Sequence, residues 1–218
     1  KTDLMQQKAE ELRLAGKVLG FVPTMGFFHE GHLELMRVAR KHCDVVIISI
    51  FVNPMQFGPK EDLGAYPRDL EGDLAKAREA GVDIAFVPTV DQMYPEGFES
   101  RVSVEKVTNH LCGLSQPTHF DGVCTVVAKL FHIVKPHRAY FGQKDLQQCA
   151  VIRRMVKELG WARMLTTIDR SVLARYCDNF SKWMAAEKAL HIADKPAKKH
   201  LQKVIAYCTA ALETCEAE

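Results

Sequence analysis

The fold class is decided by residues 21–32, FVPTMGFFHEGH, in which an apolar strand ends in a glycine turn and a helix follows. We predict the strand over 17–22, running into Pro23, and the helix over 31–42, where apolar residues recur at helical spacing. A β-branched run follows at 44–52, and such a run is typical of a parallel strand buried on both faces. Strand, helix and strand in this order predict the beginning of a parallel sheet.

The same alternation continues on both sides of this stretch. Before it, a helix is predicted at 4–14 and stopped by Gly16; after it, a helix at 69–80 is closed by Gly81 and a strand at 84–87 ends at Pro88. Further predicted elements are helices at 104–111 and 122–134, a strand at 139–141, and a helix at 145–159. We therefore predict an α/β fold, a Rossmann-like parallel sheet with helices on both faces and right-handed crossovers.

The composition changes after Gly160. All 13 glycines lie in residues 1–160, and Pro196 is the only one of the nine prolines in the remainder. Two amphipathic helices are predicted there, one following a capping-box pattern at 166–169 and one beginning near Pro196. We predict a Rossmann-like nucleotide-binding domain over 1–164, followed by an α-helical C-terminal hairpin over 165–218.

Composition and charge exclude several classes of protein. With 47% hydrophobic and 26% charged residues, the 218-residue chain matches a soluble globular protein rather than a fibrous or disordered one. Its net charge of +2 predicts no nucleic-acid partner, and its apolar runs are too short for a membrane span or a signal peptide. The seven cysteines stand singly, so we expect reduced, buried thiols and a cytoplasmic protein.

The chemistry is predicted at the glycine turn, where His29, Gly31 and His32 lie at a helix start. In an open α/β sheet, ligands bind beyond the carboxyl ends of the strands, and a helix N-terminus attracts phosphate. Two imidazoles there can donate to phosphoryl oxygens, and Gly31 lets the backbone approach a base or ribose. The alternative is that the histidines only cap the helix or are solvated in the turn. That alternative is the better one for a lone histidine, but two histidines with two glycines favour a nucleotide site.

This segment resembles the HxGH signature of nucleotidyltransferases related to class I aminoacyl-tRNA synthetases, and the string PTMGFFHEGH at 23–32 resembles the pantothenate synthetase family in particular. Five more strings stand in that family's order: SIFVNPMQF at 49–57, YPR at 66–68, MYP at 93–95, THFDGV at 118–123 and FGQKDLQQ at 141–148. The resemblance implies an ATP-dependent ligase that joins pantoate to β-alanine through a pantoyl-adenylate, with Mg²⁺ accompanying ATP. It also implies a homodimer.

The resemblance further implies roles for particular residues. His29 and His32 would contact the ATP phosphates, with His32 stabilising the transferring α-phosphate. The other implied contacts are Lys144 to the phosphates, Met25, Gly31, Gly142 and Asp145 to the nucleotide, Gln56 and Gln148 to pantoate, more weakly Asn53 and Gln147, and Asp73 as a metal neighbour.

Ordinary structural roles stand beside these assignments. Without the family context, a glutamine after a strand is a surface hydrogen-bonding group and a Lys-Asp pair is solvated. We expect Phe51 and Phe120 in the core, whereas Phe57 and Tyr66 fit a core or a pocket wall equally well. For His119, a structural hydrogen bond is as good an interpretation as substrate contact.

The resemblance ends near residue 161. The family's Ser-Ser-Arg-Asn loop and its small C-terminal lid domain do not follow, so we expect the activity to be impaired. Residues 165–190 loosely resemble a phage terminase small subunit. Three hypotheses follow: a pantothenate-synthetase-like ligase, a nucleotide-binding module without full turnover, and a phage-type helical interaction protein on an α/β scaffold.

Overall fold

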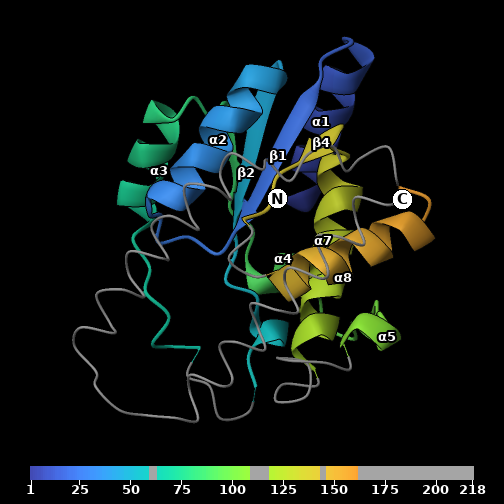
Figure 1. Ribbon diagram of the computed structural model, residues 1–218. Helices are drawn as coiled ribbons and strands as arrows, with labels where there is room; N and C mark the ends of the chain where they lie inside the picture. Colours follow the sequence, from blue (N-terminus) through green and yellow to red (C-terminus); the bar gives the residue numbers. More distant parts are fainter. Residues whose placement is uncertain (59–62, 109–117, 143–145, 162–218) are drawn as a thin grey trace, which may run out of the picture. The chain divides into compact units, whose positions relative to one another are not determined.

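The computed structural model describes residues 1–58, 63–108, 118–142 and 146–161, which form an α/β unit (Figure 1). Four parallel strands build its sheet in the order β3-β2-β1-β4. Their bounds are β1 Leu19–Thr24, β2 Val45–Ile50, β3 Ile84–Phe86 and β4 Arg138–Ala139. The parallel sheet with helices confirms the predicted fold class. The predicted domain boundary after residue 164 and the helical hairpin over 165–218 lie outside the described residues.

Helices cover both faces of this sheet (Figure 1). On one face α2 (Glu30–His42) and α3 (Leu70–Glu79) pack against Val22, Val46 and Ile48. On the other face α1 (Thr2–Leu14), α7 (His119–Val134) and α8 (Leu146–Glu158) pack against Phe21 and Ile47. Neighbouring residues of one strand thus point to opposite layers, because side chains alternate along a strand. This explains why the central strands are mostly apolar on both faces.

Three short elements complete the described part: η1 (Pro54–Gln56), α4 (Val90–Met93) and α5 (Glu105–Thr108). Elements as short as η1 and α4 have no periodic pattern in the sequence, since three or four residues are too few for one, and neither was predicted. Helix α7 begins at His119, one turn before the predicted residue 122. The strand predicted at 139–141 is Arg138–Ala139. The predictions that Phe51 and Phe120 belong to the core are confirmed, with exposed fractions of 5% and 3%.

The sheet topology brings the predicted site segments to one edge. Residues 25–32 follow β1, 51–57 follow β2 and 140–142 follow β4, and these three parallel strands are neighbours. Because β2 and β4 flank β1, the chain leaves β1 toward one side of the sheet and later returns to its other side. This reversal is the topological switch point at which open α/β sheets bind ligands.

The described cysteines Cys43, Cys124 and Cys149 are buried, as predicted. None of the helices in the described part of the chain combines the length and the apolar character that crossing a bilayer requires.

Candidate functional site

The turn after β1 has an unusual backbone that is held by one buried carboxylate. Gly26 and Phe27 have φ angles of 88° and 55°, both in the left-handed region. The backbone N–H groups of Phe27 and Phe28 donate to Asp73 Oδ2 and Oδ1, each at 2.7 Å. Successive N–H groups in such a turn form a concave anion site. Here the anion is the side chain of Asp73, which is only 1% exposed.

Helix α3 fixes this turn from outside it. Besides the two bonds to Asp73, Lys76 Nζ donates to the carbonyl oxygen of Phe28 at 3.2 Å. A Cβ on Gly26 would lie 3.0 Å from Asp73 Oδ2, so a side chain there would crowd the carboxylate as well as strain the backbone. The turn that precedes the two histidines therefore has its path set by α3.

These contacts bear on the predicted metal role of Asp73. Both of its oxygens accept backbone N–H groups, and its side chain is almost inaccessible. Among the described residues, no group of three His, Cys, Asp or Glu side chains is arranged to hold a metal ion. The contacts of Asp73 thus give it a structural role in the turn, and its metal role stays a prediction.

His29 and His32 cap helix α2 reciprocally. Gly31 N–H donates to His29 Nδ1 at 3.1 Å, and His29 N–H donates to His32 Nδ1 at 3.4 Å. The two ring centroids lie 4.1 Å apart. A neutral imidazole whose Nδ1 accepts a hydrogen bond has its proton on Nε2. Capping and phosphate binding are thus compatible, because capping uses Nδ1 and makes Nε2–H the donor atom of each ring.

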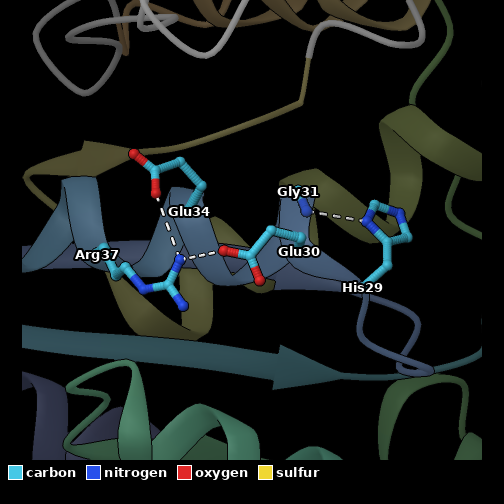
Figure 2. A network of polar contacts seen from close by, with 5 residues as sticks. All are labelled: His29, Glu30, Gly31, Glu34 and Arg37. Carbon is cyan, nitrogen blue, oxygen red and sulfur yellow. Dashed lines mark hydrogen bonds and ion pairs between the residues drawn. The ribbon is translucent and has the colours of Figure 1, made fainter. Parts of the chain in front are cut away.

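Gly31 is needed to place His29 (Figure 2). A Cβ at this position would lie 2.9 Å from His29 Cε1, so any side chain would push the ring away. The contact with the neighbouring ring is a reason for glycine that the sequence did not indicate, and the approach of a nucleotide to Gly31 stays a prediction. Figure 2 also shows Arg37 bridging Glu30 and Glu34, an ion pair that the sequence analysis missed. The hydrogen bond to Glu30 is the main cause that raises the pKa of Arg37.

A second cluster lies after β2 and is made of neutral groups. Asn53 is fully buried, and its Nδ2 donates to Gln56 Oε1 and to Gly122 O, both at 3.0 Å. Its Oδ1 accepts from Tyr94 Oη at 2.8 Å and from Met55 N–H at 3.3 Å. All four hydrogen-bonding positions of this amide are used. We call Asn53, Gln56 and Tyr94 the amide cluster.

Close packing of η1 on α7 supports the amide cluster. A Cβ on Gly122 would lie 2.2 Å from Met55 O, which only glycine avoids. The Nδ1 atom of His119 and the carbonyl oxygen of Gln56 form a hydrogen bond of 2.9 Å between the same two elements. This bond supports the structural interpretation of His119. The strings at 49–57 and 118–123 are therefore parts of one packed unit.

The remaining predicted residues lie near these clusters or outside the described chain. Met25 is half-buried at the start of the turn, and Gly142 lies beside α2, where a Cβ would be 3.8 Å from Leu35 Cδ1. Gln148 is half-buried on α8, and Gln147 Nε2 donates to Val107 O at 3.2 Å, a structural bond to α5. Lys144 and Asp145 lie outside the described residues.

Three residues that position the predicted site segments were not predicted from the sequence. Lys76, Tyr94 and Gly122 contact the site segments through chain separations of 41 to 69 residues, and such contacts leave no local pattern. Tyr94 and Gly122 do belong to the strings that carried the family resemblance. Their presence in those strings was the one available signal.

Comparison with known proteins gives two family matches. A family model described as pantoate-beta-alanine ligase matches residues 1–180, and one described as phage terminase, small subunit, matches residues 150–214. Both resemblances seen in the sequence are thereby confirmed.

Individual relatives agree with the first match. Pantothenate synthetases of Syntrophobacter fumaroxidans and Geobacter sulfurreducens are 64% and 59% identical over 156 residues, which is 72% of this chain and 55% of each relative. A crystal structure of pantothenate synthetase from Thermus thermophilus is 54% identical, with a TM-score of 0.68, and covers 72% of this chain and 58% of that one. A pantoate-beta-alanine ligase from Francisella tularensis, complexed with beta-gamma ATP and beta-alanine, is 38% identical, with a TM-score of 0.72 and coverages of 76% and 64%. This chain thus spans little more than half the length of the curated relatives it matches.

Proposed function

Because this chain belongs to the pantoate-beta-alanine ligase family, we propose that it binds ATP and pantoate at the carboxyl edge of its sheet and forms pantothenate. The main support is the histidine pair, whose Nδ1 atoms cap α2 and whose donor atoms are therefore the Nε2–H groups. The solved relative complexed with beta-gamma ATP and beta-alanine supports ATP and β-alanine as substrates.

The proposed reaction proceeds in two steps. A pantoate carboxylate oxygen attacks the α-phosphorus of ATP, so that a C–O–P linkage forms and pyrophosphate leaves. The amine of β-alanine then attacks the acyl carbon, an amide forms, and AMP leaves with the bonding electrons while the amine loses a proton. A carboxylate is a poor acyl donor, and adenylation supplies the leaving group that it lacks. The protein's part is to orient the reactants and to offset phosphate charge.

In this proposal the two imidazoles act as hydrogen-bond donors at the first turn of α2. Negative charge increases on the α-phosphate as its phosphorus is attacked, and donors aimed at that charge stabilise the transition state. The positive end of the α2 dipole contributes in the same direction. Gln56 and Gln148 would bind pantoate, Met25 and Gly142 would line the nucleotide site, and Lys144 and Asp145 are assigned by resemblance alone. No step is assigned to Mg²⁺, and the homodimer and the cytoplasmic location stay predictions.

Two substitutions of His32 test this role. Asparagine places an oxygen near the position of Nδ1, so His32→Asn retains the cap but loses the Nε2–H donor. Glutamine places an N–H near Nε2, so His32→Gln retains the donor and weakens the cap. We expect His32→Asn to lower the rate of AMP release by about 100-fold, the usual size for one such donor, and His32→Gln to retain much of the rate. The measurement is AMP formed from ATP, pantoate and β-alanine, alongside the free energy of unfolding.

His42→Asn is the matched control, since His42 is exposed at the other end of the same helix. Equal rates for His32→Asn and the unmodified chain would remove His32 from the mechanism. A large loss of stability in His32→Asn with a proportional loss of rate would reduce His32 to a cap.

A nucleotide-binding module without full turnover is the second candidate. It rests on the same histidine pair, whose Nε2–H groups can bind a phosphate with or without turnover. Calorimetric binding of ATP without release of AMP would support it over the ligase.

The terminase match at residues 150–214 is the observation behind the third candidate, a helical interaction protein. Salt-dependent binding to duplex DNA would support it.

A further inference from the structure

We propose that Tyr94 and Asn53 are positioning residues that hold the Gln56 side chain with its Nε2 amide group toward the substrate, so that Gln56 binds an oxygen of pantoate as a hydrogen-bond donor. The inference rests on the proposed function, in which Gln56 contacts pantoate. It adds the polarity of that contact and the residues that impose it.

The orientation of the Asn53 amide follows from two backbone groups. The carbonyl of Gly122 can only accept a hydrogen bond, and it lies 3.0 Å from one end of the amide. The N–H of Met55 can only donate, and it lies 3.3 Å from the other end. The first end must therefore be Nδ2 and the second Oδ1. Because Asn53 is fully buried, no water competes for these positions.

The orientation of the Gln56 amide follows in turn. Asn53 Nδ2 has two N–H groups, of which one points to Gly122 O and the other to Gln56 at 3.0 Å. The atom of Gln56 at that contact must accept, so it is Oε1. The Nε2 group lies at the opposite side of the amide, and it makes no hydrogen bond to another residue in the described part of the chain. Gln56 is half-buried at the end of η1, at the ligand edge of the sheet.

Tyr94 completes the series of contacts. Asn53 Oδ1 can only accept, so the Tyr94 hydroxyl, 2.8 Å away, must donate its proton to it. Burial raises the pKa of Tyr94 well above its ordinary value of 10.0, which keeps this donor protonated. The ring is held by Phe51 and Phe98, with centroids 6.0 Å and 5.0 Å away. Each group in the series Tyr94, Asn53, Gln56 thus fixes the direction of the next.

The chemical consequence is a choice between ligand atoms. An amide whose oxygen is already used presents only N–H donors, and these match the carboxylate or hydroxyl oxygens of pantoate. Without the Tyr94 hydroxyl, Asn53 Oδ1 retains only the longer bond from Met55 N–H. The Asn53 amide then loosens, and Gln56 can turn its oxygen toward the ligand. We expect a loss equal to about one net hydrogen bond, or roughly a fivefold weaker affinity.

The first test compares two tyrosines that lose the same atom. In Tyr94→Phe we expect pantoate binding, measured by calorimetry on the full chain, to weaken about fivefold while ATP binding stays within about twofold. Tyr140→Phe is the matched control, because the buried Tyr140 hydroxyl contacts Cys43 Sγ, at 3.4 Å, rather than a residue of the amide cluster. Unchanged pantoate affinity in Tyr94→Phe would overturn the positioning role.

The second test reverses the polarity of the contact. A Gln56→Glu side chain can still accept from Asn53 Nδ2, but it offers pantoate an anionic oxygen in place of a donor. We expect pantoate affinity to fall by about tenfold or more, since an anionic ligand then meets a like charge. Gln7→Glu adds the same charge at an exposed position of α1 and serves as control. Undiminished binding by Gln56→Glu would overturn the donor assignment.

A third measurement needs no ligand. We expect the side-chain amide protons of Asn53 to exchange slowly with water, and at least about tenfold faster in Tyr94→Phe, because a buried hydrogen bond protects them. Equal exchange rates in both proteins would overturn the positioning inference. If exchange behaves as expected while the unmodified chain binds no pantoate, the proposed function fails and the positioning of Gln56 stands.

Discussion

At both ends of the sheet, side chains accept hydrogen bonds from backbone N–H groups of the loops. The accepting side chains are exposed or half-buried at the amino end and buried at the carboxyl end. At the amino end, the residue before a strand accepts a backbone N–H from the start of its neighbour: Asp44 from Val18 at 2.8 Å, and His137 from Leu19 at 3.0 Å. Asp44 is exposed and His137 half-buried. At the carboxyl end, Asp73 accepts the N–H of Phe27 and Asn53 accepts the N–H of Met55, and both side chains are buried.

The two ends differ in whether water can replace a hydrogen bond that is lost. At the amino end the bond from Val18 N–H to Asp44 is exposed, so water can replace the acceptor when it is lost. At the carboxyl end no water replaces Asp73 or Asn53, and a lost partner leaves a buried polar group unpaired. Substitutions of these side chains should therefore cost more stability at the carboxyl end of the sheet, where the site lies, than at the amino end.

The largest effect is expected for Asp73→Ala. This change removes the charged acceptor of two backbone N–H groups in a turn with left-handed backbone. Hydrogen bonds to charged groups contribute about 1.5 to 3 kcal/mol each, so we expect the free energy of unfolding to fall by roughly 3 kcal/mol. Asp44→Ala at the amino end should lose only about 0.5 kcal/mol, because water replaces its bond. Denaturant titration of both variants measures the difference.

Asp73→Asn sharpens this test, because the amide retains the volume but turns one N–H toward a backbone N–H. We expect Asp73→Asn to lower the free energy of unfolding by nearly as much as Asp73→Ala. Similar small losses in Asp73→Ala and Asp44→Ala would abolish the distinction between the two ends. If Asp73 served only as a metal ligand, Asp73→Ala would leave the free energy of unfolding unchanged in the absence of metal.

Gly122→Ala is expected to have the second largest effect. The added Cβ would lie 2.2 Å from Met55 O, so η1 and α7 must separate. Overpacking of this kind costs about 1 to 3 kcal/mol, partly offset because alanine favours a helix by about 1 kcal/mol. We expect a net loss of roughly 1 kcal/mol and weaker pantoate binding. Gly142→Ala, whose Cβ would meet only Leu35 Cδ1 at 3.8 Å, is the control for stability. If Gly122→Ala is as stable as this control, the close packing is not a constraint.

The contrast between the ends also explains what the sequence could predict. The parallel sheet, its order of helices and strands, and the position of His29 and His32 follow from local periodicity and from one motif. The loop path set by Asp73 and the amide direction set by Asn53 do not. They depend on side chains meeting backbone groups 45 and 69 residues away, and the choice of partner is made by packing. Asp73 was predicted as a metal neighbour, but a carboxylate in a sequence does not reveal which donors it meets.

The amino end should respond to pH through His137. Burial, and secondarily the charge of Arg13, lower the pKa of His137 below its ordinary value of 6.5. The folded state thus favours the neutral ring, whose Nδ1 accepts from Leu19 N–H. The unfolded chain binds more protons just below pH 6.5, so the contribution to stability is complete above 6.5 and is lost as the pH falls below it.

His137→Asn tests this dependence, since the asparagine oxygen can accept in place of Nδ1 but does not titrate. We expect the loss of unfolding free energy between about pH 7 and 5 to be smaller in the variant, by less than about 1 kcal/mol because the ring is half-exposed. Identical pH profiles for the variant and the unmodified chain would contradict the role of His137.

The smallest effect, with the opposite sign, is expected for Ser49→Ala at the carboxyl end of β2. Ser49 is fully buried, and its Oγ has no hydrogen-bond partner among the described residues. Removing an unpaired buried hydroxyl should raise the free energy of unfolding by roughly 0.5 kcal/mol. Thr24→Val is the matched control. It removes a hydroxyl that donates to Ser49 O at 2.6 Å, so it should lower the free energy of unfolding.

The unpaired Ser49 hydroxyl lies at the end of the sheet where ligands are proposed to bind. Pantoate and ATP affinities of Ser49→Ala therefore show whether this hydroxyl contacts a ligand. Unchanged affinities in a stabilised Ser49→Ala would make the hydroxyl a packing residue, whereas weaker binding would add Ser49 to the site.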